Sequence, residues 1–244
     1  MQQTAIVTVT HDPIGRNVDL FHELQEWIGD TYSEFFITIS EESSPTLIHE
    51  VQKSKFNTKI IPKLGAAHAR REAVKFGLGG TSSHFHYCDF DRLLTWAQNH
   101  LNELKKTVQL LHQFDYLIIG RTKRAFATHP IEWIETEKIT NKICSLELGR
   151  EVDITAGSCS FSRVAGEYIQ QHSKEKMTDV EWPMIVHRIA NLEVGYHAVE
   201  GLEYHEKINS VNTQVNDTEA WLSRLKLSLI ISETAYNVGK KRIY

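Results

Sequence analysis

Cysteine and proline are scarce in this sequence of 244 residues, and no long apolar run is present. The three cysteines, Cys88, Cys144 and Cys159, form an odd, sparse set without a CxxC spacing, which argues against a disulfide framework and a structural zinc site. No apolar stretch approaches the roughly 20 residues of a membrane-spanning helix. A basic segment followed by a long apolar one is also missing at the start. We therefore expect a cytoplasmic protein without a signal peptide or a transmembrane segment.

Neither sign of charge dominates. The chain has 27 basic and 31 acidic residues and a formal net charge of -4. Such a balance provides no basic field for nucleic acid, so we expect no nucleic-acid partner. A small anion held by a local site remains compatible with it.

Glycine-rich phosphate motifs are absent as well. The sequence contains no GxGxxG, no GxxxxGK[ST] and no GxSxG. These absences argue against a dinucleotide-binding enzyme, a P-loop protein and a serine hydrolase. The loop at residues 11–16 contains a single glycine, which disfavours a nucleotidyltransferase with a glycine-rich loop after its first strand.

What the sequence does contain is an alternation of strand and helix patterns. Short apolar runs predict strands at 5–10, 34–40, 57–61, 85–91 (running into a loop) and 115–119. Helical spacing predicts helices at 17–27, 44–51, 66–76 and 93–112, and beyond residue 120 at 130–147, 164–171, 178–190 and 219–236, with an extended stretch at 152–161 and a strand at 193–199. This order predicts an α/β fold with a mainly parallel sheet.

In such sheets ligands bind beyond the carboxyl ends of the strands. The polar residues expected at that edge are His11, Asp12, Glu41, Asp89, Asp91 and Arg121.

Two of these residues, Asp89 and Asp91, stand two positions apart where the fourth expected strand ends. Side chains alternate along a strand, so both would point the same way. Neighbouring carboxylates repel each other unless a cation lies between them, and a divalent cation there would also grip a diphosphate. The pair alone is a weak signal, because most such pairs are solvated loop residues.

The wider order of features resembles a glycosyltransferase of the GT-A fold, of the family 2 type and its relatives. The matching parts are the loop at 10–12, the run Gly65-Ala66-Ala67-His68-Ala69-Arg70 and the strand end Tyr87-Cys88-Asp89-Phe90-Asp91, within residues 4–205. Arg71 stands where family members often have asparagine. The resemblance implies a Rossmann-like, mainly parallel sheet flanked by helices. It also implies a UDP- or GDP-sugar donor bound with Mn²⁺ or Mg²⁺ at Asp89 and Asp91.

The resemblance assigns further residues to the nucleotide-sugar. It places Thr10 and Asp12 in the nucleotide pocket and Glu41 beside the base or ribose. Arg70, in the helix that Gly65 opens, would lie near the diphosphate, and Gly157 would allow close approach to a sugar. The alternatives are a turn at Asp12, a surface ion pair for Arg70 and a plain turn at Gly157.

Acceptor chemistry is assigned in the same way. In similar transferases an acidic residue at the start of the helix at 178–190, here Asp179 or Glu181, contacts the acceptor hydroxyl and serves as general base in inverting members. The alternative is helix capping. His205 resembles the third metal ligand of retaining enzymes of the mannosylglycerate synthase type. Inversion and retention both remain open.

A small basic cluster follows the fifth expected strand at Arg121, Lys123 and Arg124. It would meet an anionic acceptor or phosphate, or form a solvated loop.

The chain divides into an expected GT-A domain at 1–209 and a C-terminal linker and helix at 210–244. The apolar face of that helix would pack on the domain, on a second subunit in a homo-oligomer, or on a membrane surface.

The sequence thus predicts a metal-dependent, hexosyltransferase-like glycosyltransferase that moves a sugar from a nucleoside-diphosphate sugar to a carbohydrate or small-molecule acceptor. The alternative is a non-catalytic nucleotide-sugar or carbohydrate-binding protein of the same fold.

Overall fold

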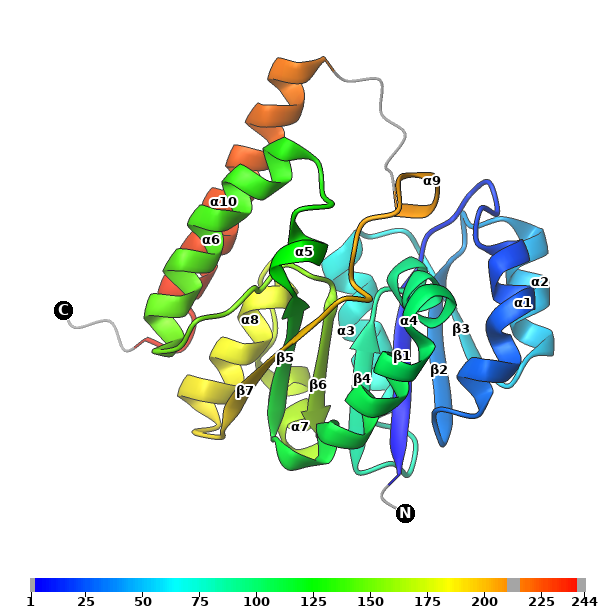
Figure 1. Ribbon diagram of the computed structural model, residues 1–244. Helices are drawn as coiled ribbons and strands as arrows, with labels where there is room; N and C mark the ends of the chain where they lie inside the picture. The colour runs from blue at the N-terminus through cyan, green and yellow to red at the C-terminus, as the bar shows by residue number, and fades with distance from the viewer. Residues whose placement is uncertain (1–2, 210–215, 241–244) are drawn as a thin grey trace.

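One seven-stranded sheet runs through the computed structural model, which describes residues 3–209 and 216–240 (Figure 1). Its strands are β1 (Thr4–Thr10), β2 (Glu34–Ser40), β3 (Asn57–Ile61), β4 (His84–Cys88), β5 (Tyr116–Arg121), β6 (Ser158–Ser162) and β7 (Val194–Val199). The spatial order is β3-β2-β1-β4-β6-β5-β7. Only β6 runs antiparallel to its neighbours, β4 and β5. The predicted α/β class with a mainly parallel sheet is confirmed.

Helices cover both faces of this sheet (Figure 1). One face carries α1 (Val18–Gly29), α2 (Pro45–Lys53) and α4 (Phe90–Leu110), and their shared apolar core includes Phe21, Phe90 and Trp96. The other face carries α3 (Ala66–Gly77), α7 (Arg163–His172) and α8 (Thr178–Met184), with the π-helical turn η2 (Ile185–Ile189), around Phe85, Phe161 and Trp182. The short elements are η1 (Leu111–Gln113), α5 (Lys123–Phe126) and α9 (Glu206–Asn209). Each apolar helix face thus buries itself on a strand face that is also apolar.

Two long helices, α6 (Ile131–Leu148) and α10 (Asp217–Asn237), lie side by side and extend beyond the sheet (Figure 1). Their contacts keep the same order along both helices, so the two run parallel: Thr140 Oγ1 lies 2.7 Å from Ser228 Oγ, and further along Glu147 pairs with Lys240 at 2.8 Å. The predicted linker falls mostly on residues outside the described ranges. The division into 1–209 and 210–244 stays a prediction.

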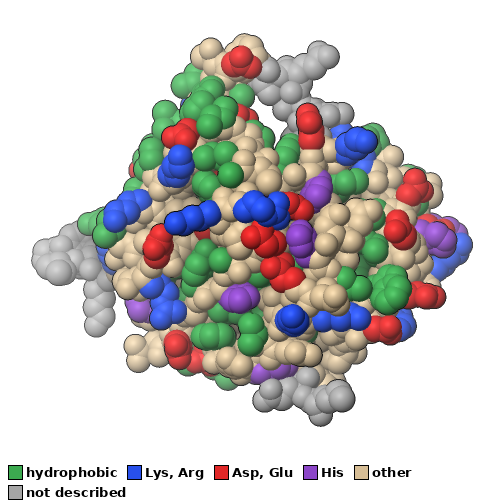
Figure 2. Space-filling model, viewed as in Figure 1, with side chains coloured by type: hydrophobic (Ala, Val, Ile, Leu, Met, Phe, Trp, Pro, Cys, Tyr) green, Lys and Arg blue, Asp and Glu red, His purple; other side chains and the backbone are tan. Residues whose placement is uncertain are grey.

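Hydrophobic side chains gather over α6 and α10 on the face seen in Figure 2. The exposed ones are Ile131, Ile139 and Leu146 on α6, and Trp221, Leu222, Leu225, Leu229, Ile230 and Tyr236 on α10. A second subunit or a membrane surface as the partner of this face stays a prediction. In the described ranges, no helix combines the length and the apolar character needed to cross a bilayer.

The junction between β4 and α4 differs from the prediction. The strand ends at Cys88 and the helix begins at Phe90, so Asp91 lies in the first helical turn rather than in an extended segment. Phe90 is fully buried under α4 together with Leu93 and Leu94, three and four positions later, and this spacing favours helix from Phe90 onward. The expectation that Asp89 and Asp91 alternate along a strand is therefore wrong, although both residues reach the same site.

Candidate functional site

Two cavities meet beyond the carboxyl ends of the strands. The larger cavity, of about 760 Å³, is lined by the ends of β1, β2 and β3 and by the loops that follow β1 and β3. The smaller cavity, of about 400 Å³, is lined by α6, α10, the loop at 155–157 and the segment at 176–179. Five residues line both: Ala66, Arg70, Asp89, Asp91 and Asn209.

The wall of the larger cavity includes Thr10 and Asp12, both predicted for the nucleotide pocket. The buried Asp12 carboxylate accepts hydrogen bonds from the backbone N–H groups of Arg16 at 3.0 Å and Asn17 at 2.9 Å. Asp12 thereby fixes the loop at 13–16, as the turn alternative also required. Ile14 from that loop and Leu64 from the opposite one line the cavity while 69% and 67% exposed. These two side chains offer apolar surface to a ligand.

Gly65 opens α3 with a φ of 93°, and nothing lies within 4 Å of where a side chain would begin. One helical turn later, Arg70 points into the site. Its Nη2 donates to Oδ2 of Asp89 at 2.8 Å, and its Nη1 bonds the carboxylate of Asp179. Burial opposes the charged guanidinium, but the carboxylates of Asp179 and Asp89 outweigh it and hold the pKa of Arg70 well above its ordinary value. The surface ion-pair alternative for Arg70 is therefore wrong.

Asp89 is fixed from three sides. Arg70 holds Oδ2, the Tyr87 hydroxyl donates to Oδ1, and the backbone N–H of Asp89 donates to the carbonyl of Gly157 at 3.0 Å. Gly157 has a φ of 75°, and a Cβ there would lie 2.7 Å from Asp89 Oδ2. Glycine at 157 is thus required both by backbone conformation and by the close approach of Asp89.

Asp91 lies beside Asp89 and accepts a hydrogen bond from Asn209 Nδ2 at 2.7 Å. Burial raises the pKa of the Asp91 carboxyl, Arg92 opposes this shift, and the Asp89 charge adds to it. A buried carboxylate next to a second one is stabilised by added positive charge. Hard oxygen ligands of this kind fit Mn²⁺ or Mg²⁺.

The predicted triad of Asp89, Asp91 and His205 is not assembled. Within residues 3–209 and 216–240, no group of three or more His, Cys, Asp or Glu side chains is arranged to hold a metal. The His205 ring lies 3.4 Å from Glu203 Oε1 and 3.4 Å from Asn99 Nδ2. The chain turns into α9 at this point, so that Asn209 rather than His205 contacts Asp91.

Asp179 and Glu181 separate although both lie in α8. Asp179 lines the smaller cavity. The Glu181 carboxylate instead accepts hydrogen bonds from the backbone N–H of Lys174 at 2.5 Å, that of Glu175 at 2.7 Å and the Ser173 hydroxyl at 2.5 Å. Its side chain lies outside both cavities because it fixes the segment before the helix. This position departs from the expectation for Glu181 and leaves Asp179 as the candidate.

Arg121 and Glu41 lie elsewhere than expected. Arg121 is 4% exposed and bonds Asp153 at 2.7 Å and Glu137 at 2.6 Å, so it is a buried link between β5, α6 and the loop before β6 rather than a cationic loop residue. Arg124 pairs with Glu200 at 2.5 Å. Glu41 is exposed and lies outside both cavities.

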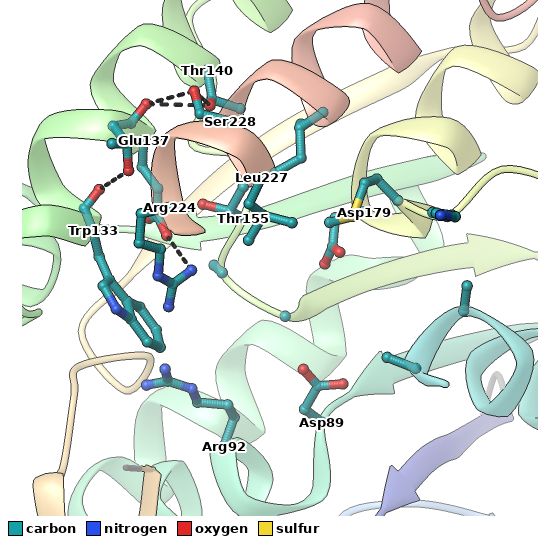
Figure 3. A pocket seen from close by; sticks show the side chains of 18 of the residues that line it. Asp89, Arg92, Trp133, Glu137, Thr140, Thr155, Asp179, Arg224, Leu227 and Ser228 are labelled. Atoms are coloured by element: carbon teal, nitrogen blue, oxygen red, sulfur yellow. Dashed lines mark hydrogen bonds and ion pairs between the residues drawn. The ribbon is translucent and has the colours of Figure 1, made fainter. Parts of the chain in front are cut away.

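Sequence reasoning missed a group of residues on the smaller cavity. Figure 3 shows Arg92 and Arg224 reaching into it beside the ring of Trp133. Asn209 and Lys176 also line it. These residues come from α4, α10, α6, α9 and the segment before α8, which are far apart in the sequence. No sequence motif of short spacing could have predicted that these residues lie together.

Comparison with known proteins gives structural similarity alone: no protein-family model and no curated protein sequence matches. Glucosyl-3-phosphoglycerate synthase from Mycobacterium tuberculosis in complex with UDP is similar with a TM-score of 0.58 and 9% identity, over 96% of this chain and 80% of that one. The fold is GT-A-like.

The same mycobacterial enzyme in complex with Mn²⁺, UDP-glucose and phosphoglyceric acid is similar with a TM-score of 0.53 and 10% identity, over 92% of this chain and 80% of that one. The 4-diphosphocytidyl-2C-methyl-D-erythritol synthase of Anaerococcus prevotii gives a TM-score of 0.51 and 11% identity, over 93% and 98%. The GT-A-like fold of this chain therefore occurs in enzymes of different reactions, and the activity has to be argued from the site.

Proposed function

We propose that the protein is a metal-dependent glycosyltransferase that uses a nucleoside-diphosphate sugar. The larger cavity would bind the donor and the smaller cavity the acceptor. The observation that carries this proposal is the shared wall: Arg70, Asp89 and Asp91 line both cavities. A group transferred between two ligands has to pass the boundary between their sites, and the charged residues lie at that boundary.

In the larger cavity, the base and ribose would lie between the loop fixed by Asp12 and the loop that carries Leu64. Thr10 and Gly65 would line the nucleotide, and the open space above Gly65 admits a ligand close to the backbone. The mycobacterial enzyme was solved with UDP and with UDP-glucose, which supports a uridine or related nucleotide as donor.

Asp89 and Asp91 are the residues that would hold a divalent cation, which when bound neutralises negative charge on a leaving diphosphate. Arg70 would add a fixed positive charge next to Asp89, already oriented by Asp179. Such preorganised charge stabilises a transition state without reorganisation at the moment of reaction. The complex of the mycobacterial enzyme with Mn²⁺ supports the same class of cation.

On the acceptor side, Asp179 would accept a hydrogen bond from the attacking hydroxyl. Its carboxylate lines the smaller cavity, and its bond to Arg70 fixes its position next to the shared wall. A carboxylate suits this role because it only has to receive a proton or orient the hydroxyl. In this proposal, a role for His205 as a ligand requires movement of the segment that leads into α9.

Turnover tests the proposal. Release of nucleoside diphosphate would be measured with UDP-glucose, UDP-N-acetylglucosamine and GDP-mannose, in the presence of Mn²⁺ and a panel of small hydroxyl compounds. We expect turnover with one donor and a loss of at least about 100-fold in Asp91→Ala, on the scale of removing one charge-stabilising group. Asp19→Ala is the matched control, because Asp19 also lies in the first turn of a helix but is exposed.

Wild-type turnover in folded Asp91→Ala protein would reject the role of Asp91. Binding of a nucleotide-sugar with no turnover under any condition would favour the non-catalytic binding protein instead.

A further inference from the structure

We propose that the smaller cavity binds an acceptor through an anionic group, a phosphate or a carboxylate, held between Arg92 and Arg224. This inference rests on the proposed function and makes its acceptor class specific. It follows from two guanidinium groups in the cavity that have no close ion-pair partner among the described residues.

Arg224 enters the cavity from α10. Its guanidinium carbon lies over the Trp133 ring, 3.2 Å from the ring centre, so the group is in contact with an aromatic surface. Its carboxylate partner is Glu137, at the long distance of 3.9 Å. The other oxygen of Glu137 is bonded to Arg121 at 2.6 Å. Glu137 is therefore committed to the buried Arg121 and only weakly compensates Arg224.

Arg92 enters the cavity from the start of α4. Its Nη1 donates to the backbone carbonyl of Glu203 at 3.1 Å and approaches Oδ1 of Asn209 at 3.4 Å, and its guanidinium carbon lies 5.8 Å from the ring of Tyr204. All these partners are neutral. In the part of the chain that the structure describes, no carboxylate forms an ion pair with Arg92.

Figure 3 shows the guanidinium groups of Arg92 and Arg224 directed toward the same space beside Trp133. Like charges converge there, and the nearby acids are engaged: Asp89 and Asp179 both bond Arg70. Asp91 accepts a hydrogen bond from Asn209, and Arg92 only partly offsets the effect of burial on the pKa of its carboxyl. Burial lowers the pKa of Arg224 to about 10, and Glu137 only partly opposes this shift. An anion between the two guanidinium groups would satisfy both, and arginine forks suit carboxylate and phosphate oxygens.

The rest of the cavity defines the remainder of the ligand. Asp179 and Asp89 lie on the side away from Trp133 (Figure 3), where the proposed transfer takes place. A volume of about 400 Å³ is at the small end of the range for ligand pockets. The cavity therefore fits a small hydroxy compound with its anionic group at the arginine pair and its hydroxyl near Asp179.

The test is a calorimetric titration of protein saturated with UDP and Mn²⁺, so that phosphate cannot enter the larger cavity. The probes are glycerol 3-phosphate, glycerate and glycerol, which share a hydroxyl-bearing skeleton and distinguish phosphate from carboxylate. We expect one or both anions to bind and glycerol to show no binding. Arg224→Gln and Arg92→Gln should each weaken the anion at least tenfold. Lys226→Gln, an exposed residue on the same helix, should leave it within twofold.

Equal affinity of wild type and Arg224→Gln for the anions, or equal affinity for glycerol and the anions, would overturn the inference. UDP binding is the separate control, because Arg224 does not line the larger cavity. If none of UDP, GDP, CDP and dTDP binds, the proposed function fails. The same titration without nucleotide then still tests the arginine pair, and loss of anion binding in Arg224→Gln would uphold it alone.

Discussion

The Nη2 atom of Arg70 lies 2.8 Å from Oδ2 of Asp89, at the wall that separates the two cavities. Because the same guanidinium also bonds Asp179, one side chain of α3 fixes the end of β4 and the start of α8. The geometry of the site therefore depends on a largely buried cation with two anionic partners.

Replacing Arg70 with Met should destabilise the protein by about 1–3 kcal/mol, because it leaves two partly buried carboxylates without their shared partner. The free energy of unfolding would be measured by urea denaturation. Arg71→Met is the matched control, since among the described residues Arg71 donates only to the backbone carbonyl of Glu175, at 2.8 Å. Equal losses in both variants would contradict the special position of Arg70.

Gly157→Ala should disturb Asp89 specifically. The added methyl would lie 2.7 Å from Asp89 Oδ2, in a backbone conformation with a φ of 75°. Gly149→Ala imposes similar backbone strain, with a φ of 68°, but nothing lies within 4 Å of the new atom. Each should lose roughly 1–2 kcal/mol of stability from the left-handed conformation. Only Gly157→Ala should also weaken Mn²⁺-dependent UDP binding, by at least about tenfold, in a calorimetric titration. Similar UDP affinities in the two variants would contradict a role for the close contact between residue 157 and Asp89.

Asp91 gives the site a pH dependence. Its pKa is raised by burial, so the ionised carboxylate costs stability above that raised value, and the cost disappears below the ordinary pKa of 3.8. Asp91→Asn should therefore raise the melting temperature of metal-free protein at pH 7, with a smaller gain near pH 4. Mn²⁺ with UDP should raise the melting temperature of the wild type and not of the variant. A variant that is less stable than wild type at pH 7 and equal to it at pH 4 would show that the ionised Asp91 stabilises the protein, which would contradict this prediction.

Leu64 is expected to contact the nucleotide. Its side chain is 67% exposed at the larger cavity, and burial of a leucine against a ligand contributes about 1.5–3 kcal/mol when complete. Leu64→Ala should raise the dissociation constant of UDP by about three- to tenfold, since 1.4 kcal/mol corresponds to a factor of ten. Leu146→Ala is the control, because Leu146 is 68% exposed and lies on α6 outside the larger cavity. An unchanged dissociation constant in Leu64→Ala would remove the residue from the nucleotide site.

The fold was predictable because its signals are local. The predicted strands at 34–40 and 57–61 coincide with β2 and β3, since short β-branched runs bounded by turns are easily recognised. The order of strands and helices then fixed a mainly parallel sheet, and the edge at which Asp12 and Asp89 meet followed from it. Asp91 shows the limit of this reasoning: Phe90 fits both the strand pattern before it and the helical spacing of Leu93 and Leu94 after it, and the structure has α4 begin at Phe90.

The contacts that define the site were harder to predict from the sequence. Asp179 and Glu181 are equivalent in the sequence, but hydrogen bonds from the segment at 173–175 commit only Glu181 to structure. The sequence placed Arg121 in a basic loop, but in the structure it is buried and pairs with Asp153 and Glu137 from other parts of the fold. Such roles depend on tertiary partners, which a single sequence does not specify.

The most direct test of the central claim is a calorimetric titration of UDP, GDP, CDP and dTDP into wild-type protein, each with and without Mn²⁺. The donor-site account predicts that one of these nucleotides binds and that Mn²⁺ tightens the binding at least about tenfold, with the gain lost in Asp91→Asn. Absence of binding by all four nucleotides at millimolar concentration, with folded protein and with Mn²⁺ present, would contradict it.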